Sequence, residues 1–118
     1  MKTTAKHFEE FKRYHAEYLT RFGLLQWRVE YKHEALEDSY AVSDMSFTGK
    51  CMEVTLATHW TKSRPPDSTE LRRLAKHEAV HALLHGLYWH AKARFIQPDT
   101  LNEVEESIVR TLDRLIPD

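Results

Sequence analysis

The stretch Lys76-His77-Glu78-Ala79-Val80-His81-Ala82-Leu83-Leu84 contains the pattern His-Glu-x-x-His. On an α-helix, residues four apart differ by only about 40° of rotation, so His77 and His81 project side by side. Two imidazoles at this spacing can bind one tetrahedral zinc ion, and Glu78 then lies beside the open position that water would occupy. Because a chain with eight histidines can produce this pattern by chance, the surrounding sequence must decide its meaning.

The residues around the pattern predict a central helix. Asp67 and Glu70 have the spacing of a capping box, which predicts a helix that begins at Asp67 or Ser68. Over residues 79–84 this helix is apolar almost all the way round, which is typical of a buried helix. Two histidines and a glutamate inside a buried helix need polar partners, and a metal ion with a bound water would satisfy all three. The alternative is a hydrogen-bonded structural cluster without a metal.

The chain before this helix predicts one helix and a small sheet. Apolar residues at three- and four-residue steps predict an amphipathic helix over residues 4–22, with Gly23 as its C-cap. Alternating apolar and polar residues then predict three strands, over residues 27–32, 39–47 and 51–58. Their short connections favour an antiparallel meander. The sequence therefore predicts a single α+β domain over residues 1–118, with a mainly antiparallel three-stranded sheet.

A catalytic zinc site requires a third protein ligand. The downstream candidates are two histidines and three glutamates: His85, His90, Glu103, Glu105 and Glu106. One straight helix rarely supplies three ligands to a tetrahedral ion, which disfavours the histidines. A last helix is predicted from Asp99 or Thr100 to Ile116, with Thr100 and Glu103 as a capping box. Glu105 falls inside its apolar stripe, where a carboxylate needs a partner, so Glu105 is the predicted third ligand. Alternatively, its charge only favours the start of the helix.

Composition sets the broad class of the protein. With 118 residues, 42% of them hydrophobic and 30% charged, the chain resembles a soluble globular domain. The formal net charge of −1 gives no electrostatic drive toward nucleic acid or an anionic membrane. Cys51 is the only cysteine, which excludes an intrachain disulfide and a Cys-x-x-Cys zinc ribbon. No apolar run is long enough for a signal peptide or a membrane span, so we expect a cytoplasmic protein.

Three regions of the chain together resemble a known family. They are Val54-x-Leu56 with Trp60, then Leu71-x-x-Leu74-Ala75-x-His77-Glu78-x-x-His81-x-Leu83-Leu84, and then Glu105-Glu106-x-Ile108-Val109-x-x-Leu112. These regions resemble the small zincin-like metallopeptidases (gluzincins) of phages and bacteria, which are similar to the metallopeptidase domains of the ImmA/IrrE group. The chain lacks the thermolysin-type Asn-Glu-x-x-x-Asp and the ImmA-type Glu-x-x-Ala-Asn, and Asn102-Glu103 keeps Glu103 as a competing ligand. The run His81-Ala82-Leu83-Leu84 is also similar to SprT-like proteases, but their later His-Gly-x-x-Phe and zinc ribbon are missing.

The resemblance implies a zinc-dependent hydrolase that cleaves a peptide or protein substrate. His77, His81 and Glu105 would hold Zn²⁺, and Glu78 would act as the general base toward a metal-bound water. The strand over residues 52–58 would be the sheet edge that binds an extended peptide. Two other function classes stay open: a zincin-fold module that binds or regulates a partner without cleaving it, and a structural domain that binds no metal.

Overall fold

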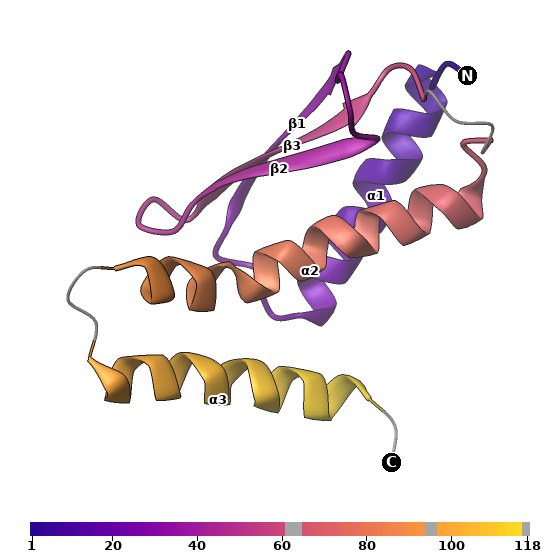
Figure 1. Cartoon of the computed structure of the whole chain (residues 1–118). Coiled ribbons are helices and arrows are strands. Elements are labelled where there is room, and N and C mark those ends of the chain that lie inside the picture. The colour runs from indigo at the N-terminus through magenta and orange to yellow at the C-terminus, as the bar shows by residue number, and fades with distance from the viewer. Residues whose placement is uncertain (61–64, 94–96, 117–118) are drawn as a thin grey trace.

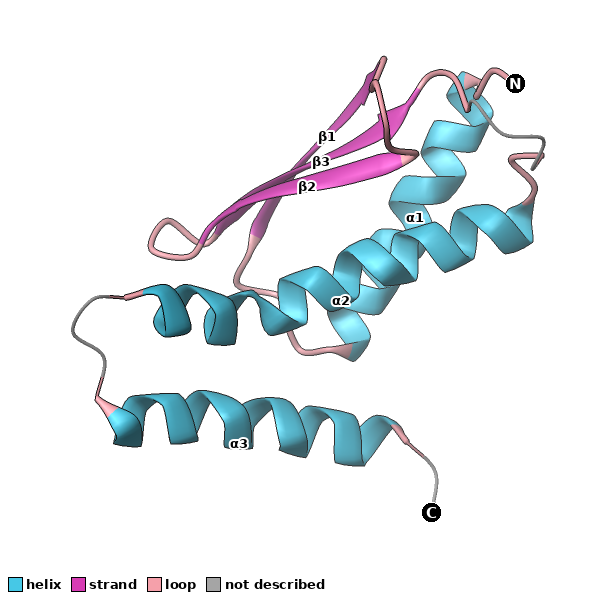
Figure 2. Ribbon diagram, in the orientation of Figure 1, coloured by secondary structure: helices cyan, strands magenta, loops and turns pink. Residues whose placement is uncertain are grey.

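The structure is a computed structural model that describes residues 1–60, 65–93 and 97–116. Its elements follow one another as α1 (Ala5–Arg21), β1 (Arg28–Glu34), β2 (Ala41–Ser46), β3 (Cys51–Ala57), α2 (Ser68–Lys92) and α3 (Pro98–Leu115). The sheet forms one layer, α1 and α2 cross beneath it, and α3 returns antiparallel to α2 (Figures 1 and 2). The predicted α+β architecture, with its three helices and three strands in this order, is confirmed.

The helix boundaries follow local capping signals. The Thr4 hydroxyl accepts a hydrogen bond from the His7 N–H at the start of α1, and Gly23 after its end has a φ of 73°. At the start of α2, the Asp67 carboxylate accepts a hydrogen bond from the Glu70 N–H at 2.9 Å, as predicted. The predicted Thr100 cap is wrong, because α3 begins at Pro98, whose fixed φ suits the first turn of a helix.

The sheet is mixed, and its strand order is β1-β3-β2. β1 pairs parallel to β3, and β2 pairs antiparallel to β3 on the other side. The predicted meander is therefore wrong, as is the prediction that residues 52–58 form an edge. The reason is burial: β3 carries Met52, Val54 and Leu56 on the helix-facing side and Thr55 and Ala57 on the other, all buried. The strand that is buried on both faces takes the central position, and β2 lies at an edge of the sheet, with no further strand beside it among the described residues.

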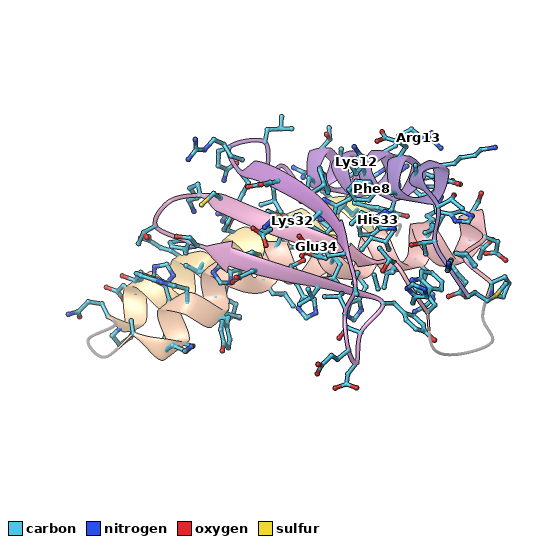
Figure 3. The ribbon with its side chains drawn as sticks, turned by 90° about the horizontal axis from the view of Figure 1, so that it is seen from above. Phe8, Lys12, Arg13, Lys32, His33 and Glu34 are labelled. Carbon is cyan, nitrogen blue, oxygen red and sulfur yellow. The ribbon has the colours of Figure 1, made fainter. Side chains whose placement is uncertain are left out.

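The core lies between the sheet and the pair α1 and α2. Its members that are completely shielded from solvent are Phe11, Val54, Leu56, Ala57, Leu71, Ala75 and Ala79. Toward the N-terminal end of α1, Phe8 stacks on His33 of β1 with ring centroids 4.9 Å apart (Figure 3). These contacts fix α1 and α2 against one face of the sheet.

The two C-terminal helices are less buried than the sequence predicts. α2 buries one face, whereas Val80 and Leu84 on its other face are exposed, so the prediction that residues 79–84 are buried all round is wrong. α3 has no buried residue, although its sequence carries an apolar stripe. Within the described part of the chain, no helix combines the length and apolar character needed to span a membrane.

His15 is a polar side chain that α1 carries into the core. It has no exposed surface, its Nδ1 atom lies 2.9 Å from the hydroxyl of Tyr31 on β1, and its Nε2 atom has no hydrogen-bond partner among the described residues. Burial lowers the pKa of His15 from 6.5 to about 4 and raises the pKa of Tyr31 to about 12. Between about pH 4 and pH 6.5, His15 is therefore neutral in the folded protein and protonated in the unfolded chain.

We predict that this buried imidazole makes folding stability depend on pH. Because the unfolded chain binds a proton at His15 near pH 6.5 and the folded chain only near pH 4, stability is lost as the pH falls between these values. The free energy of unfolding should decrease by about 2 kcal/mol between pH 7 and pH 4.5 from this group. Urea denaturation in the presence of a chelator measures it. His15→Leu should flatten the dependence of unfolding free energy on pH, whereas His59→Leu, at an exposed histidine, should not. Equal slopes in the wild type and both variants would contradict the assignment of the pH dependence to His15.

Candidate metal centre

The middle of α2 brings two imidazole nitrogens together at its surface. His77 and His81 lie one helical turn apart, and their Nε2 atoms are 3.2 Å from each other. Both side chains are exposed to solvent, and their rings are nearly perpendicular, with an interplanar angle of 81°. The prediction that these two side chains project side by side is confirmed. Their exposure corrects the expectation that they are buried.

The separation of the two Nε2 atoms fits joint coordination of one ion. Zinc–nitrogen bonds of about 2.0–2.1 Å at a tetrahedral angle place two nitrogen atoms about 3.3–3.4 Å apart. The observed 3.2 Å is close to this value, and it is also a hydrogen-bond distance, as in the alternative of a hydrogen-bonded cluster without a metal. Neutral imidazole is also a preferred zinc ligand. The donor set therefore fits a divalent transition-metal ion.

Glu78 lies beside the pair but faces the protein interior. Its side chain is 4% exposed, and its Oε1 atom accepts a hydrogen bond of 2.7 Å from the hydroxyl of Ser43 on β2. A buried carboxylate is costly unless it is hydrogen-bonded, so Ser43 stabilises Glu78 where it is. The ligand atoms of His77, Glu78 and His81 all lie within 4.8 Å of one another. Among the described residues, this is the only such group of three potential ligands.

The remaining candidates on α2 lie outside this group. His85 packs between the rings of Trp27 and Phe47, and its Nε2 atom is buried without a partner in the described part of the chain. Burial, together with the charges of Lys50 and Lys92, lowers the pKa of His85. His90 Nδ1 lies 2.6 Å from the carbonyl oxygen of Gly86, so its ring is held on its own helix.

The structure does not bring the predicted third ligand to the histidines. Val104 of α3 packs against Gly86 of α2. A Cβ atom added to Gly86 would lie 3.8 Å from the Val104 side chain. Gly86 is nine residues after His77 and therefore roughly half a turn around α2, on the opposite face of the helix. Since the two helices are antiparallel, Glu105 is level with His85, about 9 Å along the axis from the midpoint of the histidine pair.

The glutamates of α3 therefore have other surroundings. Glu105 is exposed, so the prediction that its carboxylate points into the core is wrong, because the stripe of α3 is only partly covered by α2. Glu106 is also exposed, and Glu103 borders the gap between α2 and α3. Ligation of zinc by Glu105 stays a prediction, and it would require α3 to occupy a different position.

The sequence also failed to indicate Ser43. An apolar side chain such as that of Val42 would be expected on the inner side of the second strand, but Val42 is 42% exposed and Ala41, Ser43 and Met45 face the helices. One-residue shifts of this kind exchange the two faces of a strand. The signal that could have indicated Ser43 is the burial of Glu78 on the neighbouring helix, because a buried carboxylate requires a hydrogen-bond donor nearby.

Comparison of the chain with protein-family models, with curated proteins and with solved structures finds no match.

We predict that zinc binding depends on the histidine pair and not on the other candidates. His77→Ala and His81→Ala should each weaken zinc affinity by more than about 100-fold. Loss of a residue that only hydrogen-bonds to a metal ligand already weakens metal affinity by about 10- to 100-fold, and loss of the ligand itself should cost more. His85→Ala should bind as the wild type does, because His85 lies outside the group. Metal analysis and competition with a chromophoric chelator measure this. From the position of α3 we expect Glu105→Ala to keep its zinc, and a loss as large as that of His77→Ala would mean that α3 moves to the metal.

We also predict that Ser43 stabilises the fold through Glu78. Ser43→Ala should lower the free energy of unfolding by about 1–3 kcal/mol, since it leaves a buried carboxylate without its hydrogen-bond donor. Urea denaturation at neutral pH measures this, with Ser39→Ala at an exposed loop position as the matched control. If Ser43→Ala were as stable as Ser39→Ala, the hydrogen bond would not support Glu78.

Proposed function

We propose that this protein is a zinc-dependent peptide hydrolase whose centre is formed by His77, Glu78 and His81. The observation that carries the proposal is the 3.2 Å separation of the two histidine Nε2 atoms, with a buried carboxylate within 4.8 Å of them. Two exposed imidazoles and one inward carboxylate combine a solvent-accessible metal position with a proton acceptor. These are two parts of a metal-assisted hydrolase, and a third protein ligand, for which Glu105 stays the predicted residue, would complete the site.

In this proposal His77 and His81 would hold the ion, which when bound would polarise the scissile carbonyl and lower the pKa of water. Glu78 accepts the proton of the attacking water while the hydroxide oxygen bonds to the carbonyl carbon. Glu78 then gives the proton to the leaving nitrogen as the C–N bond breaks, so that one water yields a carboxylic acid and an amine. Ser43 binds Oε1 of Glu78, which leaves Oε2 for the proton transfer.

A second function follows if the third ligand is never supplied. Apart from Glu78, which the first proposal uses as the base, no further potential metal ligand is grouped with the two histidines in the described part of the chain. A site with this donor set could bind zinc as a regulatory or structural element without hydrolysing peptides. Zinc binding without peptidase activity would support this second function and contradict the first.

We predict that Glu78→Gln separates metal binding from catalysis. The amide keeps nearly the same shape and can still contact Ser43, but it cannot accept a proton from water. Zinc content should therefore stay near the wild-type value, while kcat for a quenched-fluorescence peptide should fall by about 100-fold or more. Glu106→Gln, an exposed glutamate of α3, is the matched control and should cleave as the wild type does. Cleavage by Glu78→Gln at the wild-type rate would rule out Glu78 as the base.

A further inference from the structure

A wide hollow of the described surface begins at the candidate metal centre. It has a volume of about 1170 Å³ and runs between β2, with the turn after it, and the C-terminal half of α2. Ser43 and His81 line it at one end, and Trp89 and Lys92 line it toward the end of α2. We call it the β2–α2 groove. A molecule bound in this groove would extend directly away from the histidine pair.

The helix wall of the β2–α2 groove is apolar although it faces solvent. Leu84 is 41% exposed and Tyr88 is 59% exposed, and they continue along the same helical face as His77 and His81. On the opposite wall lie Met45 and Phe47, and the Phe47 ring stacks on Trp89 at 5.0 Å. Apolar side chains left open beside a polar site are the usual composition of a ligand-binding cleft. The groove is therefore suited to bulky apolar side chains.

The strand wall of the groove offers main-chain hydrogen bonds. The Ala57 N–H donates to the Tyr40 carbonyl, so the alternate residues Val42 and Asp44 also turn their main-chain groups toward β3. The N–H and C=O groups of Ala41, Ser43 and Met45 are consequently directed to the free edge. An extended peptide can pair with such an edge as an added strand. This second feature is independent of the apolar wall and favours a peptide over a compact small molecule.

The direction of β2 decides which half of a peptide would lie in the groove. Ser43 contacts Glu78 near the middle of α2, whereas Phe47, further along the chain, lies against Gly86 and Trp89. β2 thus leads away from the histidine pair along the groove. A peptide that pairs antiparallel to β2, the slightly more stable pairing, would run from Phe47 toward Ser43. Its residues before the cleaved bond would then occupy the apolar groove.

We propose that the site cleaves extended peptides that carry a bulky apolar residue on the N-terminal side of the scissile bond. Leu84 and Tyr88 lie about 5 Å and 10 Å along α2 from His81. At about 3.4 Å per residue of extended chain, this corresponds to roughly one to three residues before the cleaved bond. The proposal rests on the peptide hydrolase function proposed above and adds its substrate selectivity.

The test compares matched peptides that differ only in the position of one phenylalanine in a polar, alanine-rich sequence. Phenylalanine before the cleaved bond should raise kcat/KM by about tenfold over alanine, and phenylalanine after it should not. Leu84→Asp and Tyr88→Ala should each abolish most of this gain. Val109→Asp, which changes a similarly exposed apolar residue on α3, should keep it. An equal or opposite preference in the wild type, or loss of the preference in Val109→Asp, would overturn the proposal.

A binding experiment separates the failure of this inference from that of the proposed function. Glu78→Gln with zinc is titrated into the fluorescently labelled phenylalanine peptide, and affinity is read from anisotropy. In a paired strand, every second amide of the peptide donates a hydrogen bond to β2. N-methylation of these amides removes the donor and should weaken binding about tenfold, whereas N-methylation of the amides between them should not. If this alternation is present but the wild type cleaves no peptide, the hydrolase function fails and the groove assignment stands. If the wild type cleaves and methylation shows no alternation, the groove assignment fails.

Discussion

The buried carboxylate of Glu78 constrains how α2 can lie against the sheet. A carboxylate that is 4% exposed needs a donor, and the Ser43 hydroxyl supplies it from β2 at 2.7 Å. Because successive helical residues differ by about 100°, directing Glu78 inward turns His77 and His81 toward solvent at the border with β2. The buried apolar face of α2 sets the rotation of the helix, and this hydrogen bond satisfies the carboxylate that the same rotation buries beside the exposed histidine pair.

The strand order gives this centre its surroundings. β3 is buried on both faces and takes the middle of the sheet, which leaves β2 as the edge next to α2. An antiparallel meander would have placed another strand at this edge and removed its free main-chain groups from the site. The mixed topology thus brings hydrogen-bonding backbone, apolar side chains and His81 of the histidine pair to one groove. Substrate selectivity in our proposal depends on that combination.

α3 shows why a ligand is harder to predict than a motif. Its stripe correctly indicated an amphipathic helix, but a stripe does not say which face of the neighbouring helix it will cover. Gly86 permits close packing of both Phe47 and Val104, and this contact directs α3 to the face of α2 opposite the histidines. Glu105 is consequently exposed and distant from the pair, and the position of α3 in the metal-bound protein decides whether it becomes a ligand.

Local sequence determined the helix and strand segments, the cap at Asp67, and the pairing of His77 with His81, because these depend on periodicity and on neighbours within one turn. It did not determine the strand order, the inward face of β2 or the side of α2 that α3 covers. Those features depend on which apolar surfaces are buried together, and such contacts join residues far apart in the chain. For the same reason Ser43, 35 positions before Glu78, became recognisable as its partner only in the folded protein.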